Sequence, residues 1–274
     1  MIVATIARDS INSPNMESND AMILDCVSRE LIAMGAEVIK VSSTKEIPAN
    51  CDAVCHMSRN SITLKELAKA EECGIKVINS TNAIKNCSRL DFVRILDENN
   101  IPQPQYKAFK DISEIESLSF PAWIKRGEGW SCHKDDVCFA SSYEEAMAAV
   151  AGMKERSIED FIYTEHCKGD IIKFYGVGCS YFHYSYPNPE KSKFGLEKIN
   201  GTPQQHPFDT NKLKEIAFRA AKAMGLQIYG GDCIVTADGD IFIIDINDFP
   251  SFSPVRGEAA KEIAKIIIDK LYER

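Results

Sequence analysis

The sequence predicts an α/β protein, with a doubly wound parallel sheet at the N-terminus followed by a mixed α+β region. Three observations support this prediction. Short β-branched runs alternate with amphipathic helical stretches over residues 1–79, as in a parallel sheet with connecting helices. Pro102 and Pro104 then punctuate the chain and indicate a domain boundary. Later, Asp238-Gly239 joins two apolar runs, which is a strong signal of a β-hairpin.

The individual elements follow from hydrophobic periodicity and from residues that start or stop helices. Residues 1–7 are apolar and β-branched, which predicts a strand, and Gly35 ends a helix predicted over 20–34. Capping boxes at Thr63–Glu66 and Ser142–Glu145 predict two helix starts. The remaining predicted strands are 38–41, 52–56, 75–78, 120–125, 137–140, 161–165 and one long alternating strand over 171–184, and the remaining predicted helices are 63–74, 88–98, 142–153, 213–224 and 263–271.

Composition limits the functional classes. The 274 residues carry a net charge of −8, which argues against non-specific nucleic-acid binding because that activity needs a basic face. No apolar run reaches the length of roughly 18 residues that a membrane span needs. The N-terminus carries polar Thr5, Arg8 and Asp9, so no signal peptide is expected either.

The ten cysteines are scattered and form no CxxC pair. The nearest approach to a metal pattern is Cys51-x-x-x-Cys55-His56, which lacks a second pair to complete a zinc site. Small buried thiols in a reducing compartment explain this pattern better, and a cytoplasmic location is therefore expected.

The hairpin around Asp238-Gly239 predicts a cluster of oxygen ligands. A two-residue type I′ turn sets Asp232 directly opposite Asp245, and Asn247 projects from the same face. Two carboxylates and an amide oxygen at this spacing suit Mg²⁺, or Mn²⁺, which would neutralise the repulsion between the like charges. A polar outer face of the hairpin is the alternative, but the carboxylates lie within apolar runs, where an uncompensated charge is unfavourable.

Basic residues and loops follow several predicted strands. Strand 120–125 ends at Lys125, and the loop 126–135 contains glycines and a serine that can face anionic oxygens, although an ordinary hairpin loop is an equal alternative. The loop lacks the Walker A pattern. At the carboxyl ends of the N-terminal strands, residues 8–19 and 56–60 are expected to face substrate, while Arg8 and Arg59 are equally compatible with plain surface charge. The long loop 186–209 is also expected to be functional.

Several separated motifs resemble those of the ATP-grasp superfamily and occur in the same order along the chain. The ending Gly231-Asp232 … Asp245-Ile-Asn247-Asp-Phe-Pro250 is similar to its metal-binding strand pair, and Ile78-Asn-Ser-Thr-Asn-Ala-Ile84 … Ile101-Pro-Gln-Pro104 is similar to its entry segment. Residues 1–79 look like the preceding domain of glutathione synthetases, D-alanine ligases and ribosomal-protein-modifying glutamate ligases. The resemblance implies a pre-ATP-grasp α/β domain at 1–85 and an ATP-grasp fold of two α+β subdomains, a central one at 86–165 and a C-terminal one with the metal site at 166–274.

The resemblance also implies a role for each matching position. Lys125 and Arg89 would contact the nucleotide phosphates, hinge residues 164–167 would hold adenine, and Asp170 would face the ribose. The implied ATP-binding residues are Arg89, Lys125, Ser131, Thr164, Glu165, His166, Cys167 and Asp170, the implied catalytic residues are Lys173 and Arg256, and the implied metal ligands are Asp232, Asp245 and Asn247. Lys173 would face the γ-phosphate, and Arg256 would meet the substrate carboxylate or the transferred phosphoryl group.

Two positions depart from the usual pattern of the family. Arg89 stands where many relatives have a lysine, and a solvated helix arginine is its alternative interpretation. Asp245 stands where the ligases usually have glutamate, and its shorter side chain is similar to the inositol trisphosphate 5/6-kinases of the same fold.

The function implied by the resemblance is that of an ATP- and Mg²⁺-dependent carboxylate–amine ligase, which forms ADP and phosphate through an acyl phosphate. Its substrates would be small molecules or peptides, with no nucleic-acid or membrane partner, and a homodimer is compatible with it. A small-molecule kinase is the alternative enzyme, but it would need a strongly basic pocket. A nucleotide-binding protein with a degenerate site is the non-enzyme alternative, and the retained Asp232, Asp245, Asn247 and Lys125 argue against it.

Overall fold

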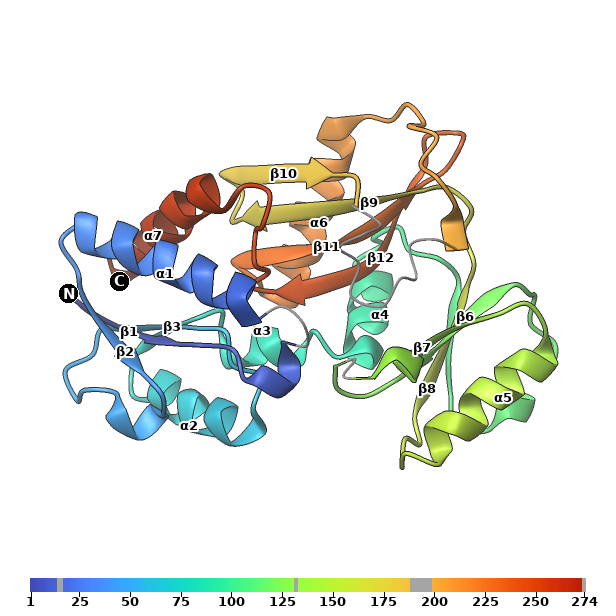
Figure 1. The fold of residues 1–274 in the computed structure, drawn as a ribbon, viewed down its shortest axis with the longest axis horizontal. Coiled ribbons are helices and arrows are strands. Elements are labelled where there is room, and N and C mark those ends of the chain that lie inside the picture. The colour runs from blue at the N-terminus through green and yellow to red at the C-terminus, as the bar shows by residue number, and fades with distance from the viewer. Residues whose placement is uncertain (14–16, 131–132, 188–198, 273–274) are drawn as a thin grey trace.

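A computed structural model describes residues 1–13, 17–130, 133–187 and 199–272 of the chain. The described strands form three four-stranded sheets that follow one another along the long axis of the molecule (Figure 1). The N-terminal sheet lies at one end, the sheet of β5 to β8 (within residues 106–165) lies at the other, and the sheet of β9 to β12 (within residues 170–248) lies between them.

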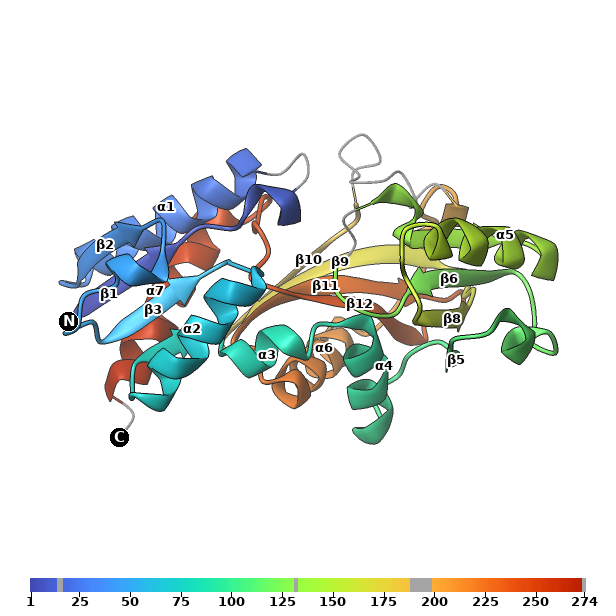
Figure 2. The same cartoon turned by 90° about the horizontal axis from the view of Figure 1, so that it is seen from below.

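The N-terminal sheet is parallel and doubly wound, so the predicted fold class is confirmed for this part. Its strands lie in the order β2-β1-β3-β4, and each pairs in parallel with its neighbour. Helices α1 and α2 lie on opposite faces of the sheet (Figure 2). The C-terminal helix α7 packs beside α1 on the same face, so the end of the chain returns to the first domain. The elements are β1 (Ile2–Ile6), α1 (Glu17–Ala33), β2 (Glu37–Val41), β3 (Ala53–His56), α2 (Ser61–Glu72), β4 (Lys76–Ile78) and α7 (Arg256–Tyr272).

The two other sheets are antiparallel, and each packs helices on one face. The order β5-β8-β6-β7 forms the sheet that α5 covers, and the order β10-β9-β11-β12 forms the sheet that α4 and α6 cover. The elements are α3 (Thr81–Lys85), α4 (Arg89–Glu98), β5 (Tyr106–Phe109), β6 (Ala122–Arg126), β7 (Val137–Ala140), α5 (Tyr143–Lys154), β8 (Phe161–Glu165), β9 (Asp170–Val177), β10 (Tyr181–Ser185), α6 (Thr210–Met224), β11 (Ile228–Val235) and β12 (Ile241–Asp248). Short 3₁₀ turns lie at Ser10–Asn12, Thr44–Glu46, Ile112–Ile115 and Lys134–Asp136.

The hairpin of β11 and β12 sets the register of the candidate site. Asp232 pairs with Asp245, as predicted, but the turn differs from the prediction. The loop has three residues, 237–239, and of these Gly239 alone has a positive φ, at 80°. This loop shifts the pairs nearest the turn by one residue, and a bulge at Ile244 shifts them back. The two departures therefore cancel at Asp232.

The close approach of β11 and β12 requires a glycine next to the aspartate pair. A Cβ at Gly231 would lie 2.2 Å from the backbone oxygen of Asp245. Any side chain at this position would push the two strands apart. The glycine before Asp232 therefore keeps the two carboxylates in register.

Three local predictions are wrong. The long strand over 171–184 is a hairpin of β9 and β10, because the chain turns at Gly178 while the alternation continues on both sides. The capping box at Thr63–Glu66 is not formed: Asn60 caps α2 by accepting from the N–H groups of Ile62 and Thr63. β5 was not predicted, because its short Tyr106–Phe109 run carries no clear alternation.

The buried amide of Asn79 is one of the groups that join the first domain to the middle sheet. The Asn79 side chain accepts hydrogen bonds from the N–H groups of Gln227 and Ile228 and donates one to the Ile228 oxygen. These bonds saturate the backbone at the start of β11. They fix the N-terminal sheet against the strand that carries Asp232.

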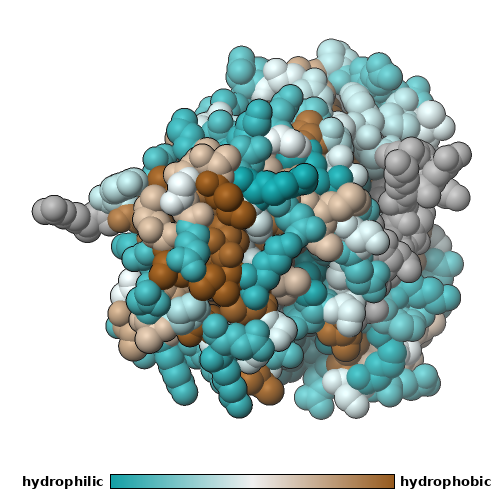
Figure 3. All heavy atoms as spheres, turned by 60° about the vertical axis from the view of Figure 1, so that its left-hand side comes forward, coloured by the Kyte–Doolittle hydropathy of each residue, from teal (hydrophilic) through white to brown (hydrophobic). Residues whose placement is uncertain are grey.

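The molecular surface is mainly hydrophilic, with an apolar patch on the side where α1 and α7 lie (Figure 3). The exposed large apolar side chains of these two helices include Met22 and Ile32 of α1 and Tyr272 of α7. Within the described residues, no helix is long and apolar enough to cross a membrane.

Candidate functional site

A row of charged side chains crosses the middle sheet. Lys173 of β9 pairs with Asp232 of β11, which pairs with Asp245 of β12. The Lys173 ammonium lies 2.9 Å from the Asp232 carboxylate. Because a bulge at Ile244 changes the alternation of β12, Ile244, Asp245 and Asn247 are all partly exposed, while their neighbours face the core. The structure thus brings the predicted metal ligands and Lys173 to one face.

The Asn247 side chain is held between an acid and an arginine. Its Nδ2 donates to Asp245 Oδ2 at 2.7 Å, and its Oδ1 accepts from Arg59 Nη2 at 3.4 Å. The amide nitrogen therefore faces the aspartate pair, and the amide oxygen faces the N-terminal domain.

A pocket next to this face collects the residues predicted to bind phosphate. Arg89 from α4, Lys125 from β6 and Thr164 from β8 line it together with Asp245. Arg89 Nη1 and Thr164 Oγ1 are buried and have no hydrogen-bond partner among the described residues. Buried polar groups are normally paired, so these two atoms are available to bond a polar ligand. The alternative that Arg89 is a solvated helix arginine is wrong.

The pKa values in the pocket reflect two cations held close together. Burial and, to a smaller extent, the neighbouring Arg89 lower the pKa of Lys125 to about 8, against the opposite effects of Asp245 and Cys167. Burial also lowers the pKa of Arg89. An anion bound between the two side chains would relieve both effects.

The predicted hinge is lined by aromatic side chains. Trp123 Nε1 donates to His166 Nδ1 at 3.1 Å, and Phe139 packs edge-on against both rings. The backbone N–H groups of Glu165 and His166 already donate to the backbone oxygens of Gln105 and Pro121. These two N–H groups are therefore not available to an adenine base. Cys167 lies close enough to Lys125 to influence its pKa. Sequence reasoning missed Trp123, although it precedes Lys125 by two residues and so shares its face.

Two predicted site residues lie in other surroundings. The Asp170 carboxylate accepts from the N–H groups of Gln204 and His206 at 2.6 and 2.7 Å, so it fixes the last part of the long loop. Arg256 begins α7 and donates to Asn19 Oδ1 on α1 at 2.9 Å. Their predicted contacts with ribose and substrate stay predictions. Ser131 and residues 188–198 of the loop 186–209 lie outside the described residues.

The loop after β6 is anchored at both ends. The buried Asp136 carboxylate accepts from Arg126, Arg156 and the His133 N–H group. Before these anchors, the Trp130 ring lies 5.3 Å from the guanidinium carbon of Arg59. This loop therefore reaches the N-terminal domain.

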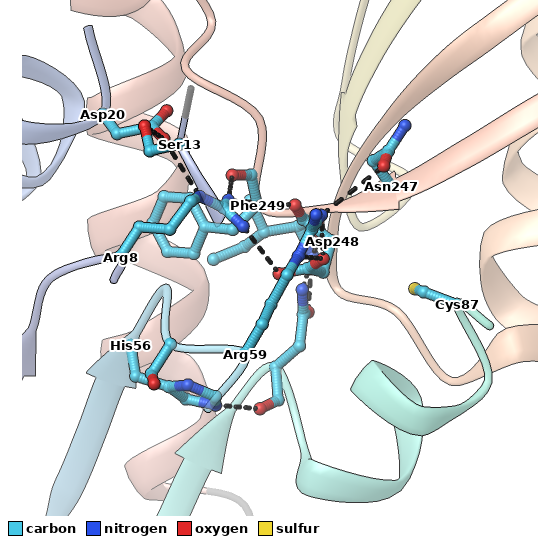
Figure 4. A network of polar contacts seen from close by, with 12 residues as sticks. Arg8, Ser13, Asp20, His56, Arg59, Cys87, Asn247, Asp248 and Phe249 are labelled. Atoms are coloured by element: carbon cyan, nitrogen blue, oxygen red, sulfur yellow. Dashed lines mark hydrogen bonds and ion pairs between the residues drawn. The ribbon is translucent and has the colours of Figure 1, made fainter. Parts of the chain in front are cut away.

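An arginine–aspartate cluster joins the first domain to the end of β12 (Figure 4). The fully buried Asp248 carboxylate pairs with Arg8 and Arg59, and Arg8 also pairs with Asp20 at 3.0 Å. Arg8 Nη2 donates to the backbone oxygen of Phe249 at 2.6 Å. The Arg8 and Arg59 side chains are only 5% and 9% exposed, so the interpretation as surface charge is wrong. Sequence reasoning could not find their partner, because Asp248 is distant in the chain.

The donor set fits Mg²⁺ that also binds phosphate oxygens. Among the described residues, no group of three or more His, Cys, Asp and Glu could hold a metal by itself. Mg²⁺ usually binds one or two carboxylates and takes its other ligands from water and substrate phosphates. Asp232 and Asp245, directly opposed beside a cationic pocket, match that pattern.

No protein-family model matches the chain, and no curated protein matches its sequence. Solved structures are similar over nearly the whole chain. A RimK domain ATP-grasp protein from Sphaerobacter thermophilus has a TM-score of 0.71 at 16% identity, covering 98% of this chain and 100% of the other. The D-alanine–D-alanine ligase from Bacillus anthracis, solved with ATP, has a TM-score of 0.74 at 13% identity, covering 99% and 97%. The ATP-grasp ligase PsnB, solved with a minimal precursor, Mg and ADP, has a TM-score of 0.65 at 15% identity, covering 99% and 98%.

Proposed function

Starting from the ATP-grasp fold that the chain shares with these proteins, we propose that it is an ATP- and Mg²⁺-dependent carboxylate–amine ligase that forms ADP and phosphate. One observation carries the proposal: Arg89 and Lys125 face one pocket with Asp245, and Arg89 Nη1 is buried there without a hydrogen-bond partner in the described part of the chain. Two adjacent cations that form no ion pair with any described residue favour a polyanionic ligand such as a nucleoside triphosphate.

The residues of the site have separate roles in phosphoryl transfer. Lys125 and Arg89 neutralise and orient the phosphates, and Lys173 supplies a third cation across the sheet. Asp232, Asp245 and Asn247 would hold Mg²⁺, which stabilises the charge that develops on the transferred group. The substrate carboxylate then attacks the γ-phosphate to give an acyl phosphate, and an amine displaces the phosphate. The loop that carries Trp130 would keep water away from this reactive product.

The small-molecule kinase stays the second candidate, because Asp245 is shorter than the glutamate of the ligases. The arginines of the N-terminal domain weigh against it. Arg8 and Arg59 are paired with Asp20 and Asp248, so they offer little net positive charge to a polyphosphate.

Analysis of the reaction products tests the proposal. The protein is incubated with Mg-ATP and pools of amino acids, dicarboxylic acids and short peptides, and the products are identified by mass spectrometry. We expect a condensation product together with ADP and free phosphate. A phosphorylated product would instead establish a kinase, and ATP consumption equal to that of the Asp245→Ala variant would refute the proposed site.

The pKa of Lys125 predicts how nucleotide binding depends on pH. A phosphate beside Lys125 raises its pKa above 8, because an opposite charge favours the charged form. Binding of Mg-AMPPNP should therefore take up a proton at pH values of about 8 to 9, and the affinity should fall as pH rises through this range. Calorimetry in two buffers of different protonation enthalpy measures the uptake. In the Lys125→Arg variant, which stays protonated, the uptake should vanish, and a wild-type protein without uptake would contradict the phosphate role of Lys125.

A further inference from the structure

The orientation of the Asn247 amide is the wrong one for a metal ligand. Magnesium binds amide groups through oxygen. In the structure the amide nitrogen faces Asp245, while the oxygen faces Arg59. To bind a metal shared with Asp245, the amide must turn over and give up the Arg59 contact.

Arg59 is fixed on several sides, so it cannot easily follow such a rotation. Its Nε donates to Asp248 Oδ1 at 2.7 Å, and its Nη2 pairs with the same carboxylate. Its backbone N–H donates to Asp9 Oδ2 at 3.2 Å. The Trp130 ring covers the guanidinium at 5.3 Å, which adds a cation–π contact (Figure 4 shows the arginine between Asp248 and Asn247).

We propose that Arg59 is a positioning residue that holds the Asn247 amide in this orientation and thereby lowers the affinity of the site for its metal. The proposal rests on the metal role of Asp232, Asp245 and Asn247 in the proposed function. Its consequence is that the N-terminal domain, through one side chain, sets how tightly the C-terminal sheet binds Mg²⁺. The cation itself acts in the same direction, because it repels a divalent ion placed near Asn247.

Binding of Mn²⁺, followed by electron paramagnetic resonance at saturating AMPPNP, tests the proposal without turnover. The Arg59→Lys variant keeps the charge next to Asp248 but loses the planar fork that also reaches Asn247. We expect it to bind Mn²⁺ about threefold to tenfold more tightly, which corresponds to one ordinary hydrogen bond. Trp130→Ala, which leaves every charge in place, should shift the affinity in the same direction by a smaller factor.

Arg8→Lys is the matched control. Arg8 shares Asp248 with Arg59 but contacts neither Asn247 nor Trp130 among the described residues. Its Mn²⁺ affinity should equal that of the wild-type protein. An equal gain in Mn²⁺ affinity in Arg8→Lys would show that the effect passes through Asp248 and would overturn the proposal. Unchanged or weaker Mn²⁺ binding in Arg59→Lys and Trp130→Ala would also overturn it.

The same titration separates this inference from the proposed function. If Asp245→Ala binds Mn²⁺ as well as the wild-type protein does, the metal site itself is wrong, and the inference fails with it. If Asp245→Ala loses Mn²⁺ but Arg59→Lys leaves its affinity unchanged, the metal site stands and only the role of Arg59 is refuted.

Discussion

Replacing Asp245 with alanine is expected to reduce ATP turnover by about 10³-fold while leaving the protein folded. Asp245 lies both opposite Asp232 and in the pocket of Arg89 and Lys125, so it is the side chain that links the two halves of the site. Loss of the metal at this position would remove roughly 4 kcal/mol of charge stabilisation in the transition state, which corresponds to that factor. Coupled detection of ADP release at saturating Mg-ATP measures the effect.

Asp240→Ala provides the control for this experiment. Asp240 is exposed near the turn of the same hairpin, one residue before β12 begins. Its replacement should leave both turnover and the thermal midpoint unchanged. Equal loss in the two variants would mean that the hairpin, and not a metal ligand, has been disturbed. Full activity in Asp245→Ala would show that this carboxylate does not hold the metal.

Strand periodicity predicted the parts of the fold that depend on local pattern. The parallel N-terminal sheet follows from apolar runs alternating with helices, and β6 follows from the short run that ends at Lys125. The opposition of Asp232 and Asp245 was also predicted, but the prediction holds only because two deviations from the expected hairpin cancel. The longer turn and the bulge at Ile244 each move the register by one residue, in opposite directions. A hairpin signal gives the presence of a turn more reliably than its length.

Contacts between distant segments could not be predicted in the same way. Arg59 and Asp248 are 189 positions apart, and no local rule connects the end of β3 with the end of β12. The rule that ligands bind at the carboxyl ends of parallel strands did predict that residues 56–60 face the substrate. It could not tell that Arg59 would contact protein groups on three sides. The last helix was predicted only over 263–271, so neither its start at Arg256 nor the contact of Arg256 with Asn19 of α1 was predicted.

The placement of these arginines explains how three sheets build one site. The pocket proposed for the nucleotide takes Arg89 from α4, Lys125 from β6 and Asp245 from β12, so it exists only when the two antiparallel sheets face each other. The arginine–aspartate cluster then fixes the third sheet against the end of β12. Because Asn247 lies between Asp245 and Arg59, the position of Arg59 in the cluster and the geometry of the proposed metal ligands depend on each other.

Among the polar contacts, we expect the arginine–aspartate cluster to affect the free energy of unfolding most when it is mutated. Replacing Asp248 with asparagine removes the charge that Arg8 and Arg59 share and leaves both guanidinium groups buried with too little compensation. We expect the free energy of unfolding to fall by about 3–5 kcal/mol. Urea denaturation with linear extrapolation measures the change. The control is Asp25→Asn, which breaks the exposed pair with Lys40 and should change stability by about 0–1 kcal/mol.

The pH dependence of stability gives an independent check on Asp248. Burial alone would raise the pKa of its carboxyl, but Arg59 and Arg8 outweigh burial and hold the pKa below its ordinary value. Between the folded and the unfolded pKa values, the unfolded chain then binds more protons than the folded one. The contribution of Asp248 to stability is therefore complete above the unfolded pKa of about 3.9. It is lost as the pH falls toward the folded pKa. Stability of the wild-type protein should therefore drop more steeply below pH of about 4 than that of Asp248→Asn. Parallel curves for the two proteins in this range, or an asparagine variant as stable as Asp25→Asn at neutral pH, would mean that the two arginines do not depend on this carboxylate.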